Sequence, residues 1–246
     1  MTAPLGRRAL AELVGTATLV AIVVGSGIQA TRLTDDVALQ LLADSLATVL
    51  GLGTLIALLG PVSGAHFNPA VTLAVWWSGR HDRDGLALRS VAAYIPAQVV
   101  GAVGGAVLAN AMFAEPLIRL SGHDRSAGHL WLGELVATTG LVLLVLGLGR
   151  TAQQRLGPAL VASYIGAACW FTSSTSFANP AVTLARTFSD TFAGIAPGSV
   201  PPFIAAQLLG TGIALALTVA LFGRPTPTTT AAPTPTPEPR LATTDH

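Results

Sequence analysis

Six apolar stretches, each about as long as a bilayer is thick, constrain this chain more than any other feature of its sequence. They lie at roughly 9–29, 38–60, 87–111, 130–149, 157–174 and 202–223. A helix needs about 20 largely apolar residues to cross the hydrocarbon core of a membrane. Only 10% of the residues are charged, whereas soluble domains carry about 25%. We therefore expect an all-α membrane protein with six transmembrane helices.

The arginines flank these stretches unevenly, and this predicts an orientation. If the six spans are threaded in order, one side receives Arg7, Arg8, Arg80, Arg83, Arg89, Arg150, Arg155 and Arg224, and the other receives Arg32, Arg119 and Arg125. Cytoplasmic loops carry an excess of basic residues. We expect both termini in the cytoplasm and the chain in the cell (inner) membrane. The net charge of +1 gives no reason to expect a nucleic-acid partner.

Composition also divides the chain and limits its chemistry. Residues 224–246 are rich in Pro and Thr and cannot bury a core, so we expect a disordered cytoplasmic tail after one membrane domain over 1–223. The single cysteine, Cys169, excludes an internal disulfide and a cysteine-based metal cluster. No nucleophile–base pair indicates an enzyme, and we expect no cofactor and no metal.

The two halves of the chain repeat each other. Asn68-Pro-Ala-Val-Thr-Leu-Ala74 and Asn179-Pro-Ala-Val-Thr-Leu-Ala185 are identical and begin 111 residues apart. Further matches occur at similar offsets: Glu12–Thr16 with Glu134–Thr138, and Tyr94–Gln98 with Phe203–Gln207. These pairs indicate an internal duplication over about 5–115 and 127–223. Each half holds three spans, and because three is odd the second half enters the membrane from the opposite side, as an inverted repeat.

The duplicated Asn-Pro-Ala segments start apolar stretches of about ten residues, which are too short to span. Asn is a good N-cap, and Pro suits the first helical position. Two such half-helices in opposed halves would meet N-terminus to N-terminus near the midplane, where irregular backbone is tolerated if it lines a watery cavity. Each N-terminus carries about half a positive charge. The meeting point would repel cations and protons, while the amides of Asn68 and Asn179 offer donors to a neutral solute.

These segments resemble a known family. Gly64-Ala-His-Phe-Asn-Pro-Ala-Val-Thr72 is similar to the first signature loop of the aquaporin and aquaglyceroporin superfamily, and Phe177-Ala-Asn-Pro-Ala181 is similar to the second. The matching features run from Glu12 to Gln207. The resemblance implies six spanning helices, two re-entrant half-helices, and a homotetramer in the lipid bilayer with a passive pore for small uncharged solutes in each subunit. The pore centre that it implies is formed by Asn68, Pro69, Ala70, Asn179, Pro180 and Ala181.

The resemblance also implies a filter of four side chains near the extracellular mouth. Ungapped counting from the Asn residues gives Thr48, Ala167, Ser176 and Val182. Water-selective members typically combine an aromatic residue, a His and an Arg, and glycerol-conducting members usually keep the Arg directly after the second Asn-Pro-Ala. Because this chain has Val182 there, we expect a wider and less polar constriction that admits larger neutral solutes. Arg186 lies one turn further along the half-helix, and we do not assign it to the pore.

Other residues follow from the same resemblance. Backbone carbonyls should form an acceptor ladder along the pore: Gly64, Ala65, His66, Thr175, Ser176 and Phe177. Glu12 and Glu134 are intramembrane acids, which are candidates for proton relays by default. The family implies instead that they are buried acceptors that hold the backbone of the pore loops. We expect Asp44 to be solvated near the outer end of its helix, and Cys169 to be an inert buried thiol.

Three functions compete at this stage. The leading hypothesis is a channel for glycerol-like polyols, water and undissociated arsenite, because the segment Thr172–Arg186 with Val182 resembles bacterial aquaporin-like channels associated with arsenic resistance. The alternative within the family is an ordinary water-selective aquaporin. An ion-coupled secondary transporter also uses inverted repeats and broken helices, but Glu12 and Glu134 are the only intramembrane acids available to couple it.

Overall fold

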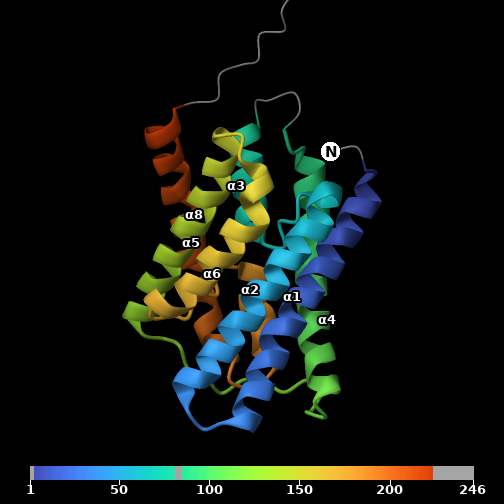
Figure 1. Ribbon diagram of the computed structural model, residues 1–246, viewed down its shortest axis with the longest axis vertical. Coiled ribbons are helices and arrows are strands. Elements are labelled where there is room, and N and C mark those ends of the chain that lie inside the picture. Colours follow the sequence, from blue (N-terminus) through green and yellow to red (C-terminus); the bar gives the residue numbers. More distant parts are fainter. Residues whose placement is uncertain (1–2, 81–84, 224–246) are drawn as a thin grey trace, which may run out of the picture.

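Long helices form one elongated bundle in the computed structural model, which describes residues 3–80 and 85–223 (Figure 1). Five of them are long and apolar enough to cross a membrane: α1 (Leu5–Leu33), α2 (Val37–Ser63), α4 (Leu88–Met112), α5 (Gly128–Arg150) and α8 (Val200–Phe222), the last with its preceding turn η3 (Pro197–Ser199). The described ranges contain no strand. The expected all-α membrane class is confirmed.

The sixth expected span is shorter than its apolar stretch. α6 (Gly157–Phe171) has 15 residues, preceded by the short 3-10 helix η1 (Gln154–Leu156), and the chain is extended at Thr172. At about 1.5 Å rise per residue, a helix of this length covers about 22 Å, against a hydrocarbon core of about 30 Å. The rest of the predicted stretch 157–174 belongs to the loop that leads back into the bundle.

Two half-helices begin inside the bundle. α3 (Pro69–Gly79) has 11 residues, as the pattern predicts, whereas α7 (Pro180–Ala185) has six and continues as the 3-10 helix η2 (Arg186–Phe188). Each begins at the Pro after a capping Asn. The side-chain oxygen of Asn68 accepts from the N–H of Ala70 at 2.9 Å, and that of Asn179 accepts from Ala181 at 3.0 Å. The N-cap chemistry therefore fixes where both half-helices start.

Glycines bring two helices within each half of the chain into close contact. A Cβ on Gly101 or Gly105 of α4 would lie 2.2 Å or 2.1 Å from a backbone carbonyl oxygen of α1. A Cβ on Gly210 of α8 would lie 2.6 Å from the carbonyl oxygen of Leu135 in α5. Small residues let helix backbones approach each other in a membrane, where packing takes the place of the hydrophobic effect. The pairs α1–α4 and α5–α8 therefore form matching frames around the centre.

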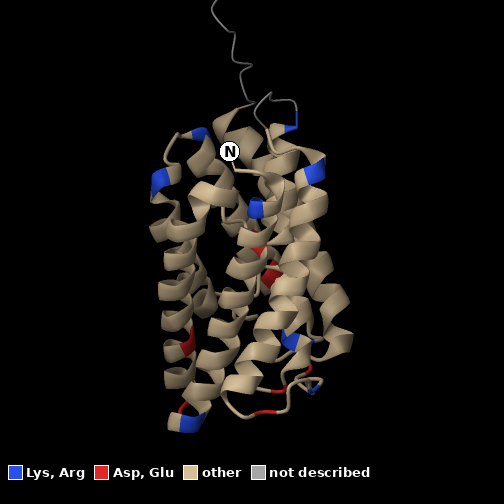
Figure 2. Ribbon diagram, turned by 90° about the vertical axis from the view of Figure 1, so that its right-hand side faces the viewer, with Lys and Arg blue, Asp and Glu red and all other residues tan. Residues whose placement is uncertain are grey.

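The outside of the bundle is apolar along its length. Leu42, Leu46 and Leu50 on α2 are each about half exposed or more, and Trp170 and Phe171 of α6 are similarly open. Figure 2 shows that most charged residues gather at the two ends of the bundle. Such a surface suits lipid rather than water. The chain is an integral, multi-pass membrane protein.

Candidate functional site

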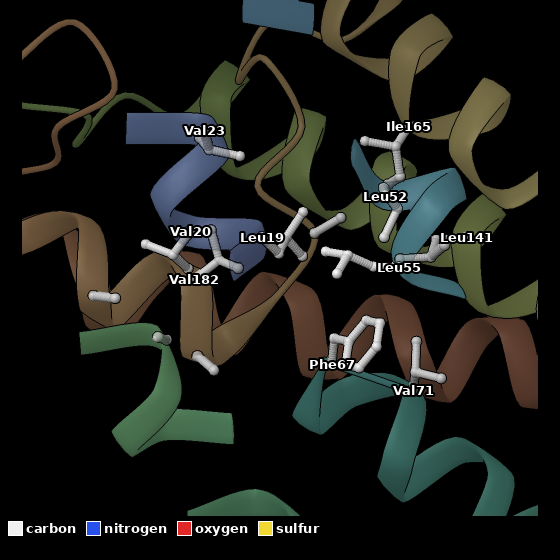
Figure 3. Packing of buried hydrophobic residues seen from close by; sticks show 14 of the residues in the cluster. Leu19, Val20, Val23, Leu52, Leu55, Phe67, Val71, Leu141, Ile165 and Val182 are labelled. Carbon is white, nitrogen blue, oxygen red and sulfur yellow. The ribbon is translucent and has the colours of Figure 1, made fainter. Parts of the chain in front are cut away.

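A cavity of about 390 Å³ lies at the centre of the bundle, where the two half-helices meet. Its wall is mainly apolar and comes from α1, α2, α5 and α6, with the loops before α3 and α7 entering it. Figure 3 shows part of this apolar packing, in which Leu19, Leu52, Ile165 and Val182 come from four different helices. Polar side chains are a minority of the residues that line it. This arrangement is typical of a selective site for a small molecule.

The two loops have matching and unusual backbones. Residues with positive φ recur at the same places in both: Gly64, Ala65 and Phe67 in the first loop, and Thr175, Ser176 and Ala178 in the second. Each position in the second loop lies 111 residues after its counterpart. A non-glycine residue in this region costs about 1–3 kcal/mol and persists when its surroundings hold it there. The six residues expected to form the carbonyl ladder all border the cavity.

Glu12 holds the first loop. Its carboxylate is fully buried and accepts hydrogen bonds from the backbone N–H of Phe67 at 2.7 Å and of His66 at 3.0 Å. The hydroxyl of Ser63 donates to it at 2.6 Å, and the amide of Gln98 at 2.8 Å. Four donors thus occupy the two carboxylate oxygens. Glu12 does not border the cavity.

Glu134 holds the second loop in the same way. It is fully buried and accepts from the backbone N–H groups of Phe177 and Ala178, both at 2.8 Å. The amide of Gln207 donates to it at 2.6 Å and also to the hydroxyl of Thr183 at 2.8 Å, as Gln98 does to Thr72 in the first half. Both acids therefore bond the backbone of a loop, and neither borders the cavity.

The two Asn side chains join the halves at the centre. The Asn68 amide donates to the carbonyl oxygen of Ala178 at 2.7 Å, and the Asn179 amide donates to that of Phe67, also at 2.7 Å. Each amide carries two hydrogens, and both residues border the cavity. Pro69, Ala70, Pro180 and Ala181 do not border it and instead begin the half-helices. Of the expected pore centre, the two Asn side chains face the open space.

The ungapped filter assignment is wrong at one position of four. Thr48, Ser176 and Val182 border the cavity, but Ala167 is exposed on the outer face of α6, in a shallow depression shared with α2. Ile165 of α6 borders the cavity instead, and so does Cys169, one turn later. Two residues along an α-helix rotate the side chain by about 200°. Ala167 therefore points away from the cavity. The assignment failed because counting backward from Asn179 crosses a loop whose length the count does not fix.

Two charged residues expected outside the pore line the cavity. Asp44 is 8% exposed and accepts from the hydroxyl of Ser26 at 2.7 Å, so the expectation of a solvated position is wrong. Arg186 is 6% exposed, its guanidinium carbon lies 3.4 Å from the centre of the Phe177 ring, and its Nε donates to the carbonyl oxygen of Ala193. Both could have been found from helical spacing, because each lies four residues from a filter position and so on the same face of its helix.

Arg125 is a cavity residue that the sequence analysis missed. It comes from the loop between α4 and α5, its Nε donates to the carbonyl oxygen of Gly194 at 3.0 Å, and its guanidinium carbon lies 5.0 Å from the centre of the Phe177 ring. Burial lowers the pKa of Arg125 from its usual value, but an arginine stays protonated in proteins. No periodicity places a loop residue, so no sequence signal could have found it.

Paired half-helices, crossed Asn contacts and a central cavity define a membrane protein built as a pore. The chain belongs to the major intrinsic protein family, whose model matches residues 1–175. It is 52% identical over 213 residues to the aquaglyceroporin AqpS of Rhizobium meliloti (strain 1021), covering 87% of this chain and 89% of that protein. It is also 30% identical over 223 residues to the probable aquaporin AqpM of Archaeoglobus fulgidus, covering 79% of this chain and 88% of AqpM.

A solved structure shows the same fold. The X-ray structure of the aquaglyceroporin from Plasmodium falciparum matches with a TM-score of 0.62 and 19% sequence identity, covering 87% of this chain and 95% of that one. The resemblance to the aquaporin superfamily that the signature loops indicate is confirmed.

Proposed function

We propose that this protein is a passive channel for small uncharged solutes: water, glycerol-like polyols and undissociated arsenite. The observation that supports it is the meeting of two half-helix N-termini and two Asn amides at one cavity, which the loop carbonyls also border. The named relatives, an aquaglyceroporin and a probable aquaporin, support the same class. A solute that leaves water here finds acceptors along both loops and donors at the centre.

Ion exclusion follows from the same geometry. Each half-helix presents about half a positive charge at its N-terminus, and the two N-termini face the same space. The crossed bonds of Asn68 and Asn179 hold the amides so that a passing water donates toward the loops and accepts at the centre. We propose that cations and protons are repelled at this point, whereas neutral molecules pass.

Val182 and Ile165 give the cavity an apolar lining that favours solutes larger than water. Val182 offers two methyl groups where glycerol-conducting relatives usually place an Arg, so it adds neither bulk nor hydrogen-bond donors. Ile165 contributes a further apolar surface. Glycerol and undissociated arsenite carry several hydroxyl donors, which suit the acceptor-rich loops. An ordinary water-selective channel would need a narrower and more polar constriction.

We propose that Glu12 and Glu134 act structurally, which disfavours the ion-coupled transporter. Both acids accept hydrogen bonds at both carboxylate oxygens and do not border the cavity. The further elements of the proposal come from the sequence: an inverted repeat over 5–115 and 127–223, a homotetramer, and an inner-membrane location with cytoplasmic termini. The tail at 224–246 lies outside the described residues.

Reconstituted vesicles test the proposal directly. Purified protein should speed osmotic shrinkage and the re-entry of glycerol, measured by stopped-flow light scattering, with no ionic current across planar bilayers. Current carried by Na⁺ or H⁺ through the purified protein would contradict the proposed repulsion of cations by the two half-helix N-termini. Fast water flux without glycerol flux would favour the ordinary aquaporin.

A further inference from the structure

A second set of polar side chains lines the cavity one helical turn beyond the filter positions. Asp44 precedes Thr48 by four residues on α2, and Arg186 follows Val182 by four at the end of the second half-helix; both border the cavity. α2 runs toward the bundle centre and α7 runs away from it. The step back from Thr48 to Asp44 and the step on from Val182 to Arg186 therefore both lead toward the end of the bundle opposite the termini. Four residues rise about 6 Å along a helix. Each charge therefore lies about one turn farther from the Asn pair than the filter position on its own helix.

Asp44 and Arg186 both border the cavity without forming an ion pair. Within the described ranges 3–80 and 85–223, the ion pairs join Arg32 to Glu115 and Arg119 to Asp190. Arg125 borders the same cavity and, like Arg186, lies against the Phe177 ring, so a second positive charge is nearby. Charges removed from water are costly unless they are paired or hydrogen-bonded. Because the two groups are not paired with each other, each can contact a molecule in the cavity.

The unused polar atoms point to the same space. The recorded bonds of Asp44 and Arg186 involve Oδ1 and Nε, and the described part of the chain records no hydrogen-bond partner for Oδ2 or for the terminal guanidinium nitrogens. An acceptor on Asp44 and donors on Arg186 thus remain without partners at the cavity.

We propose that Asp44 and Arg186 form a solute-binding site that selects small neutral molecules carrying several hydroxyl groups. A polyol or an undissociated oxyacid donates to the Asp44 carboxylate and accepts from the Arg186 guanidinium at the same time, whereas a single water molecule is too small to occupy the whole site. The site concentrates such solutes before the filter and supplies the guanidinium that position 182 lacks. This proposal rests on the proposed channel function and names the residues that choose its substrate.

Flux ratios test the site. Asp44→Asn keeps size and replaces a charged acceptor by a neutral one, so glycerol permeability in vesicles should fall about fivefold, which corresponds to about 1 kcal/mol. Water permeability should change less than about twofold, because water does not need both groups at once. Asp35→Asn, an exposed carboxylate at the same end of the bundle, is the matched control and should leave both permeabilities unchanged.

A binding measurement tests the site without relying on flux. Cys169, the single cysteine of the chain, borders the same cavity as Asp44 and Arg186. Glycerol at molar concentration should slow the labelling of Cys169 by a small thiol reagent several-fold in the wild type. In Asp44→Asn the protection should be largely lost. The protected and unprotected rates are compared within each variant, because the loss of a charge changes the thiol reactivity by itself.

The outcomes separate the two proposals. Equal glycerol-to-water ratios in Asp44→Asn and wild type would overturn the site while leaving the channel intact. Protection of Cys169 without glycerol flux in the wild type would support the site and contradict the polyol channel. If Asp44→Asn does not reach the membrane folded, the wild-type labelling decides, and an absence of glycerol protection overturns the site.

Discussion

Replacing Glu12 tests whether this acid holds the first loop or carries protons. In Glu12→Gln one oxygen becomes an NH₂ group, which cannot accept from the donors that it faces. Because one oxygen bonds Ser63 and His66 and the other bonds Phe67 and Gln98, either orientation of the new amide leaves one backbone N–H without a partner. A stranded buried donor costs about 1–3 kcal/mol.

A neighbouring side chain limits the loss. Oε1 of Gln98 is buried and has no hydrogen-bond partner among the described residues. A flip of the Gln98 amide would turn this oxygen toward the new NH₂ group, at the expense of the bond from Gln98 to Thr72. We therefore expect Glu12→Gln to lose about 1–3 kcal/mol of stability and still conduct. Glu12→Ala strands both backbone donors and the two side chains, and should fail to fold.

The assay combines stability and flux. The unfolding temperature of purified protein in detergent should fall in Glu12→Gln and by a similar amount in Glu134→Gln, because both acids accept two loop N–H groups. Glycerol flux per folded channel should persist at all values of a transmembrane pH gradient. Unchanged stability together with a loss of pH-dependent flux would refute the structural reasoning and favour a transporter.

Three further substitutions test the geometry. Val182→Arg should lower glycerol and arsenite flux much more than water flux, measured by stopped flow and normalised to incorporated protein; equal loss of all three would indicate general blockage. Ile165→Phe should narrow the cavity and reduce flux, whereas Ala167→Phe on the outer face should not, and the opposite result would restore the ungapped filter assignment. Gly101→Ala places a methyl group 2.2 Å from a carbonyl oxygen of α1 and should lower the unfolding temperature through a loss of about 1–3 kcal/mol. Gly104→Ala, which meets nothing within 4 Å, is its control; equal stability of the two variants would contradict the close approach of the helices.

Much of what the sequence could predict about the fold came from its internal duplication. The matching Asn-Pro-Ala segments predicted the two half-helices, and the resemblance to the aquaporin superfamily implied that each acid holds a loop. The cavity wall was harder. Ala167 was misplaced because its number was counted through a loop, and a change of two residues reverses the face of a helix.

The charged residues of the cavity show a second kind of limit. Asp44 and Arg186 could have been found by extending the filter positions by one turn along their helices. Arg125 could not, since its place depends on how the loop between α4 and α5 folds back onto Gly194. Local pattern predicts which face of a helix points inward, but loop contacts depend on the complete fold.

The crossed Asn contacts have a consequence for how the protein is made. Each Asn amide bonds a carbonyl 110 or 112 residues away in the other half. The ribosome therefore delivers a first loop with positive-φ residues whose partner amide does not yet exist. Such distant contacts form late in folding. The opening at the centre takes its shape once residue 179 has entered the bundle, so an incomplete chain in the membrane has no finished path through it.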